Sequence, residues 1–459
     1  MGAGVRAHEV KHRRHQDGRC TADGDGGASL AEAYLFGDVL ESVVGRVPAP
    51  DLANAARVSR EWLRAVRAAL RRRPRRLPWL VVHLQGRGAR GRSASAYDPN
   101  SGAWLTVPAV PRHATPSHVR LVRGARGDRV CALSLSGLAV AGDPLGAAAC
   151  VDLDAPAVWR VDPVFAAVGD RVVALGGACR LALEEGEDFA AVEVHEGGGW
   201  TACEPMPDAL RDSAAASWLS AAATERRVYL VERTTGWASW FDPASRQWGS
   251  TRRLGLDTAV SNWGVAPGRA GAGADERLVL FGAKRADKEA ECAVVIQAWE
   301  VDGDTLEPIP SASDDAMPSE LSEKLFPRDD EDEEEDDGWD DTTLSIGVCG
   351  NSAGGYVYNA AEPANGAVLY ELREGKATSG SAAAVARWEW VPCAPAVRAE
   401  PLGRAILGCS PVGLDELGAG SWVGGPAAGV YRRRTLKILD QSTDADGNLQ
   451  AKMWSKNVF

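Results

Sequence analysis

The residue types that most often carry chemistry are scattered along this chain of 459 residues. The histidines that could serve a metal or acid–base site are His83, His113, His118 and His195. No two of them have the local spacing of metal ligands. The nine cysteines are odd in number and never form a C-x-x-C pair, which argues against both a zinc site and a disulfide framework. We therefore predict no catalytic residue, no metal ligand and no cofactor.

One phosphate-binding pattern occurs, because Gly86-Arg-Gly-Ala-Arg-Gly91 matches G-x-G-x-x-G after a predicted strand. A dinucleotide site also needs a following helix whose N-terminal amides meet the pyrophosphate. The residues from Ser93 to Pro99 instead have the pattern of another strand and a turn. We interpret the match as a coincidence.

Charge is concentrated in a few segments. Residues 314–341 hold fifteen acidic and two basic residues, so the rest of the chain is close to neutral although the whole carries −12. Nine consecutive carboxylates, Asp329 to Asp337, repel one another and predict a disordered insert. Nine arginines between Arg57 and Arg76, and three more at 432–434, lack the interleaved aromatic residues of a nucleic-acid site. We expect solvated basic faces and no nucleic-acid partner.

The N-terminal residues 1–31 are polar and glycine-rich, and predict a disordered leader without the apolar core of a signal peptide. No apolar run approaches the ~18 residues that span a bilayer. The expectation is a soluble protein of the cytoplasm, the nucleus or both, without a membrane partner.

Residues 32–73 predict three short amphipathic helices. The first carries apolar residues at helical spacing from Val39 to Val47, and Pro48-Ala-Pro50 ends it. Asp51 and Ser59 are candidate N-caps of the second and third helices. About forty residues make a small core. This unit is therefore expected to pack against a partner.

From Pro78 onward β-strands alternate with turns, and motifs repeat. Tyr97-Asp98-Pro followed by Trp104 is matched by Phe241-Asp242-Pro followed by Trp248. Weaker matches to this motif end in Trp159 and Trp200, and paired glycines occur at 176–177 and 354–355. An Asp-Pro turn followed by a wedging Trp is typical of hairpins in stacked sheets.

The tryptophan spacings of 55, 41 and 48 residues fit one four-stranded sheet per repeat. Such units bury their faces only when several close into a ring. We predict a mainly β propeller of six blades over residues 79–430, interrupted by the acidic insert 314–341. Five blades are expected near 117–163, 164–206, 213–255, 260–311 and 342–393. The first blade is split between the ends of this region and takes a strand from 398–430, and the tail 431–459 is unassigned.

The helical segment resembles an F-box, through Leu35-Phe-Gly-Asp-Val-Leu40, Val43-Val-Gly-Arg-Val-Pro48, Asp51-Leu52 and Val58-Ser-Arg-Glu-Trp62. Phe36 departs from the family, which usually has proline there. With the repeats that follow, the chain resembles the plant F-box/kelch-repeat proteins. The kelch residues implied are Tyr97, Asp98, Trp104, Trp159, Gly176, Gly177, Trp200, Phe241, Asp242, Trp248, Gly354 and Gly355.

This resemblance implies a substrate receptor of a Skp1–cullin–F-box ubiquitin ligase. The F-box would bind the Skp1 adaptor, and through it a cullin, with Leu35, Leu40, Val43, Val47, Pro48, Leu52, Val58 and Trp62. The same side chains could instead hold the three helices together. The propeller would bind a target protein, and relatives in plants include receptors for phenylpropanoid and flavonoid enzymes.

Two other functions stay open. The propeller could be a non-degradative interaction scaffold. Kelch-type propellers also occur in oxidases, but an enzyme would need convergent catalytic side chains in the central pocket. An enzyme is the alternative that the sequence supports least.

Overall fold

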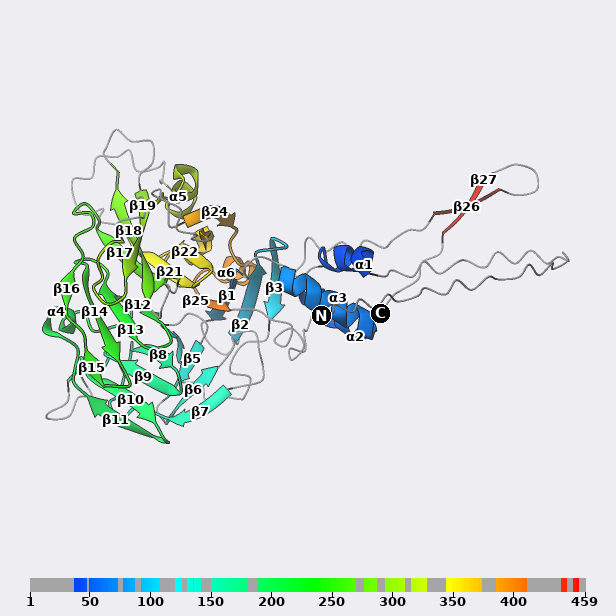
Figure 1. The fold of residues 1–459 in the computed structure, drawn as a ribbon. Helices are drawn as coiled ribbons and strands as arrows, with labels where there is room; N and C mark the ends of the chain where they lie inside the picture. Colours follow the sequence, from blue (N-terminus) through cyan, green and yellow to red (C-terminus); the bar gives the residue numbers. More distant parts are fainter. Residues whose placement is uncertain are drawn as a thin grey trace, which may run out of the picture.

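The computed structural model shows three N-terminal helices followed by a ring of β-sheets (Figure 1). It describes residues 37–47, 49–72, 77–86, 92–107, 120–125, 130–134, 136–141, 150–179, 181, 188–269, 276–286, 294–309, 315–327, 344–373, 385–410, 439–443 and 449–453. The predicted leader lies outside these ranges. In the predicted tail, β26 (Leu439–Thr443) and β27 (Leu449–Met453) form an antiparallel pair.

The helices are α1 (Gly37–Val44), α2 (Ala49–Val58) and α3 (Arg60–Arg72). Ser59 caps α3 as predicted, because its hydroxyl accepts the backbone N–H of Glu61 and of Trp62, each at 3.2 Å. The prediction for the start of α2 was wrong by three residues: a helix capped by Asp51 would begin at Leu52, but α2 begins at Ala49 and Asp51 lies in its first turn. Pro50 is tolerated there because the first N–H groups of a helix have no intrahelical partner.

Six sheets of the described chain form the blades, and all their strand pairs are antiparallel. From the channel outward, blade one is β25 (Arg404–Ser410), β1 (Trp79–Gln85), β2 (Arg92–Asp98) and β3 (Ala103–Val107). Blade two is β4 (Arg120–Arg123), β5 (Val130–Leu133), β6 (Gly137–Ala141) and β7 (Cys150–Asp154); blade three is β8 (Val164–Val168), β9 (Arg171–Leu175), β10 (Val192–Glu196) and β11 (Gly199–Cys203).

Blade four is β12 (Leu219–Ala223), β13 (Val228–Glu232), β14 (Trp237–Asp242) and β15 (Gln247–Trp248), with β16 (Arg252–Arg253) also on β14. Blade five is β17 (Asn262–Pro267), β18 (Arg277–Arg285), β19 (Val294–Asp302) and β20 (Asp315–Ala316); blade six is β21 (Ile346–Asn351), β22 (Gly354–Asn359), β23 (Ala367–Leu372) and β24 (Val385–Val391). Short helices α4 (Asp208–Arg211), α5 (Ser319–Leu325), η1 (Pro363–Asn365) and α6 (Pro395–Ala399) lie between strands.

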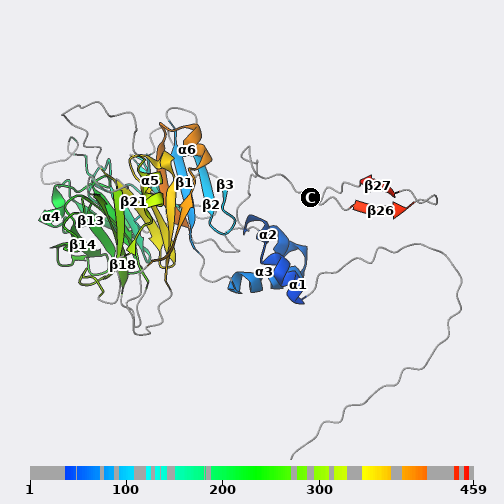
Figure 2. The ribbon, with the colours of Figure 1, turned by 90° about the horizontal axis from the view of Figure 1, so that it is seen from above.

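The ring closes within blade one, as the sequence predicted. Strand β25 comes from the C-terminal end of the propeller and pairs with β1, in a register that sets Trp79 opposite Ser410 and Gln85 opposite Arg404. The predicted ranges of blades two, three, four and six each contain all the strands of one sheet, whereas that of blade five contains three, because β20 lies beyond its end. Seen from above, the helices α1–α3 lie beside the blade that holds β2 and β3 (Figure 2).

The sequence predicted a disordered insert over residues 314–341, but part of this segment is ordered into regular structure. Residues 315–327 are described, and they form the outer strand β20 and the helix α5. Leu325 is completely buried and Met317 is 4% exposed, so these two apolar side chains anchor the segment on blades five and six. The run from Asp329 to Asp337 lies outside the described residues.

Apolar clusters fill the spaces between neighbouring blades. The cluster between blades three and four includes Leu175, Val228 and Phe241, and the one between blades six and one includes Leu80 and Tyr356. Each sheet thus buries both faces, which explains why the inner strands are almost continuously apolar.

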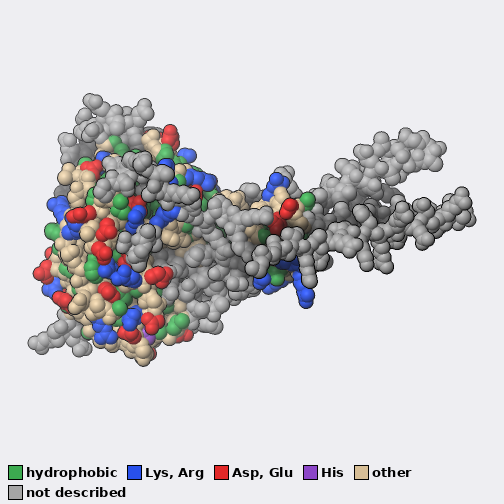
Figure 3. All heavy atoms as spheres, in the orientation of Figure 1, with side chains coloured by type: hydrophobic (Ala, Val, Ile, Leu, Met, Phe, Trp, Pro, Cys, Tyr) green, Lys and Arg blue, Asp and Glu red, His purple; other side chains and the backbone are tan. Residues whose placement is uncertain are grey.

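The surface of the propeller that Figure 3 displays mixes acidic and basic side chains. Within the described ranges, no helix has both the length and the apolar character needed to cross a membrane.

Candidate functional site

The helical unit has its own small core. Leu40 and Val44 of α1, Leu52 of α2 and Val66 of α3 are each at most 2% exposed and pack together. Both α1 and α2 contact α3, so α3 holds the other two helices in place.

The eight residues predicted to bind the adaptor fall into different environments. Leu40 and Leu52 are buried inside the unit, so they shape it and leave no surface for a partner. Val47 and Trp62 are half-buried against the same core. Val43 and Val58 are exposed. The remaining two, Leu35 and Pro48, lie outside the residues whose side chains are described.

Among the described residues of the helical unit, the large apolar side chains that are exposed are Val39 (60% exposed), Val43 (39%) and Val58 (64%). Val39 and Val43 are one turn apart and share a face of α1. The sequence analysis placed Val39 on the apolar stripe but did not select it for binding. Val39 and Val43 are therefore neighbouring apolar side chains that the unit leaves open to solvent.

A second candidate site is the mouth of the propeller channel. This pocket has a volume of about 890 Å³ and is lined by residues from all six blades or from the segments next to them. The inner strands begin here, with Arg120 first in β4, Leu219 first in β12 and Arg404 first in β25. Pockets of this size suit peptide segments or small ligands.

The helices join the propeller at the other end of blade one. β1 starts at Trp79, beside the connecting residues 77–78, and runs toward Gln85, which lies opposite the pocket residue Arg404. Tyr356 of blade six fixes the connection, because its hydroxyl donates to the carbonyl oxygen of Pro78 at 2.7 Å. The pocket mouth and the attachment of the helices are therefore on opposite sides of the ring.

The predicted Asp turns position the outer strands. In each, a carboxylate at the end of the third strand accepts backbone N–H groups two or three residues later, at 2.8–3.3 Å. Asp98 and Asp242 were predicted; Asp302 of blade five makes the same turn and was missed, because Gly303 and Pro308 stand where the motif has Pro and Trp. The residue four positions after each Asp has positive φ: Gly102 (65°), Arg246 (58°) and Leu306 (56°).

The wedging tryptophans also link neighbouring blades. The indole N–H of three of them donates to a backbone carbonyl at the end of the outer strand of the preceding blade: Trp104 to Pro392 (3.0 Å), Trp200 to Asp154 (2.8 Å) and Trp248 to Glu204 (3.2 Å). Each is the second residue of its outer strand. Tyr97 and Phe241 pack against their cross-strand tryptophans at centroid distances of 5.4 and 5.1 Å.

Two of the predicted equivalences were wrong. Trp159 is not on a strand, because blade two ends its outer strand at Asp154. Gly176 and Gly177 follow the second strand of blade three, whereas Gly354 and Gly355 begin the second strand of blade six. The glycine pairs therefore occupy opposite ends of their strands.

The first glycine pair has a clear structural cause. Gly176 and Gly177 have φ values of 54° and 66°, and a Cβ at Gly177 would lie 2.2 Å from the carbonyl group of Asp162. The buried Arg160 donates to the Gly176 carbonyl oxygen at 2.5 Å and pairs with the buried Glu193 at 2.7 Å. This ion pair, which the sequence analysis missed, fixes the connection between blades two and three.

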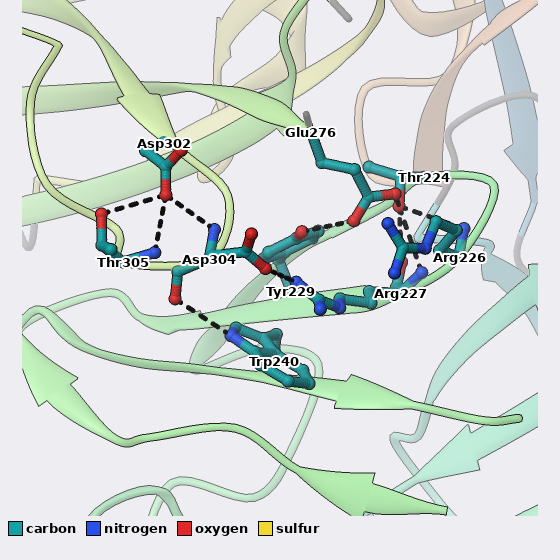
Figure 4. Close-up of polar contacts among 9 residues, drawn as sticks. All are labelled: Thr224, Arg226, Arg227, Tyr229, Trp240, Glu276, Asp302, Asp304 and Thr305. Atoms are coloured by element: carbon teal, nitrogen blue, oxygen red, sulfur yellow. Dashed lines mark hydrogen bonds and ion pairs between the residues drawn. The ribbon is translucent and has the colours of Figure 1, made fainter. Parts of the chain in front are cut away.

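A polar cluster joins blades four and five on the side of the ring away from the pocket (Figure 4). The hydroxyl of Tyr229 donates to Glu276 at 2.7 Å, and Arg227 pairs with Asp304 while lying 3.8 Å from the ring centroid of Trp240. Burial, followed by the bond to Glu276, raises the pKa of Tyr229. A raised pKa disfavours the phenolate, so this arrangement suits a structural role better than nucleophilic chemistry.

The candidate histidines do not converge. His83 is fully buried in β1, while His195 of β10 packs its ring against Trp200 at 5.3 Å; His113 and His118 lie outside the described residues. Among the residues that the structure describes, no group of three His, Cys, Asp or Glu side chains could hold a metal ion. The glycine motif that begins at Gly86 lies between the paired strands β1 and β2, so no helix follows it.

Comparison with known proteins shows similarity over most of the chain. F-box/kelch-repeat protein At1g23390 of Arabidopsis thaliana is 30% identical over 395 residues, which cover 84% of this chain and 92% of that protein. No family model matches the chain.

Solved structures give weaker similarities. Hydrazine synthase of Kuenenia stuttgartiensis is 9% identical with a TM-score of 0.30, over 61% of this chain and 70% of that one. The dihydro-heme d1 dehydrogenase NirN is 11% identical with a TM-score of 0.29, over 69% and 55%. Similarities at this level carry no argument about function.

Proposed function

The chain belongs to the F-box/kelch-repeat proteins, and from this premise we propose that it is the substrate-recognition subunit of a Skp1–cullin–F-box ubiquitin ligase. The helical unit binds the Skp1-type adaptor, and the propeller binds the protein to be ubiquitinated. Its sites of action are the cytoplasm, the nucleus or both.

The observation that supports this proposal most directly is the pair of separate surfaces. Val39 and Val43 offer an apolar face on α1 of a small helical unit, and Val58 is exposed at the end of α2. The channel mouth opens on the opposite side of the ring from the attachment of that unit. A receptor needs such a separation, because the adaptor and the target must be bound at the same time.

In this role the chain performs no bond chemistry of its own. It raises the effective concentration of target lysines near the charged ubiquitin-conjugating enzyme, so the acceleration comes from proximity and orientation. Packing between the blades holds the channel mouth at a fixed place relative to the start of β1, to which the helical unit is joined.

The adaptor surface is tested with the variant Val39→Asp/Val43→Asp and purified Skp1, by isothermal titration calorimetry. Both side chains are exposed, so the variant is expected to stay folded while its affinity falls about tenfold or more. The matched control is Val151→Asp, the same change at a valine of β7 that is 55% exposed. Equal affinity for both variants would refute the proposed surface, and failure of the unchanged chain to bind would refute the adaptor role.

A further inference from the structure

The channel mouth is strongly basic. Among the described residues that line it, four are arginines, Arg120, Arg233, Arg285 and Arg404, and a single one is a carboxylate, Asp162. The rest of the chain outside the acidic segment is close to neutral. The positive charge is therefore a local property of this pocket, where low-dielectric walls strengthen its attraction for anions.

The one carboxylate is already bound. Asp162 accepts a hydrogen bond from Arg120 at 3.0 Å through one oxygen, and from the backbone N–H of Ser217 at 2.8 Å through the other. Among the described residues that line the pocket, arginines therefore outnumber carboxylates by three.

Two of the other arginines donate to neutral acceptors. Arg404 donates to the carbonyl oxygen of Leu121 at 2.7 Å, and the buried Arg233 donates to that of Ile346 at 2.5 Å. Partial burial, together with the nearby charge of Arg120, lowers the pKa of Arg404. Positive charges are thus crowded here, and an incoming anion would relieve that crowding.

The arginines come from opposite sides of the channel. Arg404 and Arg120 belong to the adjacent blades one and two, whereas Arg233 follows β13 of blade four and Arg285 ends β18 of blade five. A ligand that contacts both sides must carry more than one negative group along its length.

An apolar contact lies at the same mouth. Trp218 lines the pocket and is 55% exposed, while its backbone is held by the bond from the N–H of Arg233 to its carbonyl oxygen at 3.0 Å. A fixed backbone with an exposed indole is typical of a binding hot spot, particularly beside arginines.

We propose that this channel mouth captures an extended segment of the target that carries at least two carboxylate side chains and one large apolar residue. The carboxylates bind across the channel to Arg285 on one side and to Arg404 with Arg120 on the other, and the apolar side chain packs on Trp218. This inference deepens the proposed function, since it gives the chemical class of the target segment. Only the ubiquitination of the captured protein rests on the proposed function; the capture itself does not.

Carboxylates fit this arrangement better than a phosphate group. A phosphate concentrates its charge at one point and is best held by arginines that converge on it. The two pocket arginines that are exposed as whole residues, Arg285 and Arg404, instead belong to non-adjacent blades. Charges distributed along an acidic peptide match them.

The test is selection of a displayed library of random peptides on the full-length chain, with parallel selection on Arg285→Ala/Arg404→Ala. We expect the unchanged chain to enrich peptides with two or more Asp or Glu residues and a large apolar residue, and the variant to lose this enrichment. Enrichment of uncharged or basic peptides, or no enrichment beyond that of the variant, would overturn the proposal.

The most enriched peptide is then labelled and measured by fluorescence anisotropy. Affinity should fall about tenfold or more in Arg285→Ala/Arg404→Ala and in Trp218→Ala. It should stay within about twofold in Arg226→Ala/Arg398→Ala, which removes two exposed arginines outside the pocket. Equal losses in the pocket variant and this control would contradict the site. Tighter binding of a peptide with one phosphoserine and no carboxylate would contradict the assignment to carboxylates.

Skp1 binding, measured on the same pocket variant, separates the two proposals. Its adaptor affinity should equal that of the unchanged chain, because the pocket lies away from the helices. A chain that captures acidic peptides but does not bind Skp1 would support the pocket and refute the ligase role.

Discussion

The buried histidine of blade one predicts that the propeller loses stability in mild acid. His83 lies in the middle of β1, opposite Ala94 and Ile406, with no exposed surface. Neither ring nitrogen has a hydrogen-bond partner among the described residues. Burial disfavours the charged ring and lowers its pKa from 6.5 to about 4.

The sign of the effect follows from the two pKa values. Above pH 6.5 the ring is neutral in both the folded and the unfolded chain, so it adds no pH dependence. Below pH 6.5 the unfolded chain takes up the proton first, and the free energy of unfolding falls until the pH reaches about 4. At 1.36 kcal/mol per pH unit, the loss from this residue reaches about 2 kcal/mol at pH 5 and about 3 kcal/mol at pH 4.

The perturbation is His83→Leu, which keeps a buried side chain of similar size and removes both unpaired nitrogens. The free energy of unfolding should rise by about 1 kcal/mol at neutral pH, because two polar atoms no longer lack partners. The advantage of the variant over the unchanged chain should grow as the pH falls from about 6.5 to about 5. Urea denaturation of both proteins, followed by tryptophan fluorescence at several pH values, measures this difference. A difference that stays constant across this range would refute the reasoning.

Three further predictions concern the blades. Trp104→Ala should cost about 2–3 kcal/mol, below the range for fully buried tryptophans because the indole is half-buried. Trp104→Phe, which keeps a ring but lacks the N–H, should cost about 1 kcal/mol; thermal melts in which Trp104→Phe is as stable as the unchanged chain would contradict the role of the indole N–H. Arg246→Gly should stabilise the fold by about 0.5–1 kcal/mol, because glycine adopts the positive φ of this position without strain. Leu306→Gly, at the same turn position, should destabilise the fold, because the Leu306 side chain is only 4% exposed. Stabilisation by both changes would show that the packing of Leu306 matters little. Glu193→Ala should cost about 3–5 kcal/mol, because it leaves the buried Arg160 without its carboxylate. Glu196→Ala, which removes a partly exposed ion pair with Arg171, should have a small effect. Similar denaturation midpoints for the two variants would argue against a stabilising role of the buried pair.

The sequence predicted the propeller because the outer hairpins of blades one and four have local causes. Asp98 and Asp242 bond to N–H groups two residues later, and the tryptophans follow at a fixed offset. Such features repeat along the chain and can be found without knowledge of the ring. The turn at Asp302 has the same geometry without those markers, and its remaining signal was an Asp at the end of a strand followed by a polar turn.

The glycine pairs show the limit of this approach. A pair of glycines next to an apolar strand marks a close approach of backbone, but it does not say at which end of the strand that approach occurs. Gly177 is needed because Asp162 of the preceding connection crosses it, whereas Gly355 lies against the Cys349 carbonyl of the first strand in its own blade. These contacts depend on tertiary packing.

The candidate sites were predictable to different degrees. Helical periodicity identified the apolar residues of α1, yet that stripe is wide and does not separate Leu40, which packs inside, from Val39 and Val43, which are exposed. The basic pocket could not be found from spacing, because ring closure brings Arg120 and Arg404 together from distant parts of the chain.

The central claim is that one surface binds the ligase and another binds the target. The most direct test is quantitative affinity purification, from plant cells treated with a proteasome inhibitor, of the unchanged chain, Val39→Asp/Val43→Asp and Arg285→Ala/Arg404→Ala. The unchanged chain should recover Skp1, a cullin and a set of ubiquitinated proteins. Val39→Asp/Val43→Asp should still recover those target proteins, with less ubiquitin attached, but should lose Skp1 and the cullin. Arg285→Ala/Arg404→Ala should recover Skp1 and the cullin but lose the target proteins. Absence of Skp1 and cullin from the unchanged chain, or loss of both groups together in either folded variant, would contradict the account.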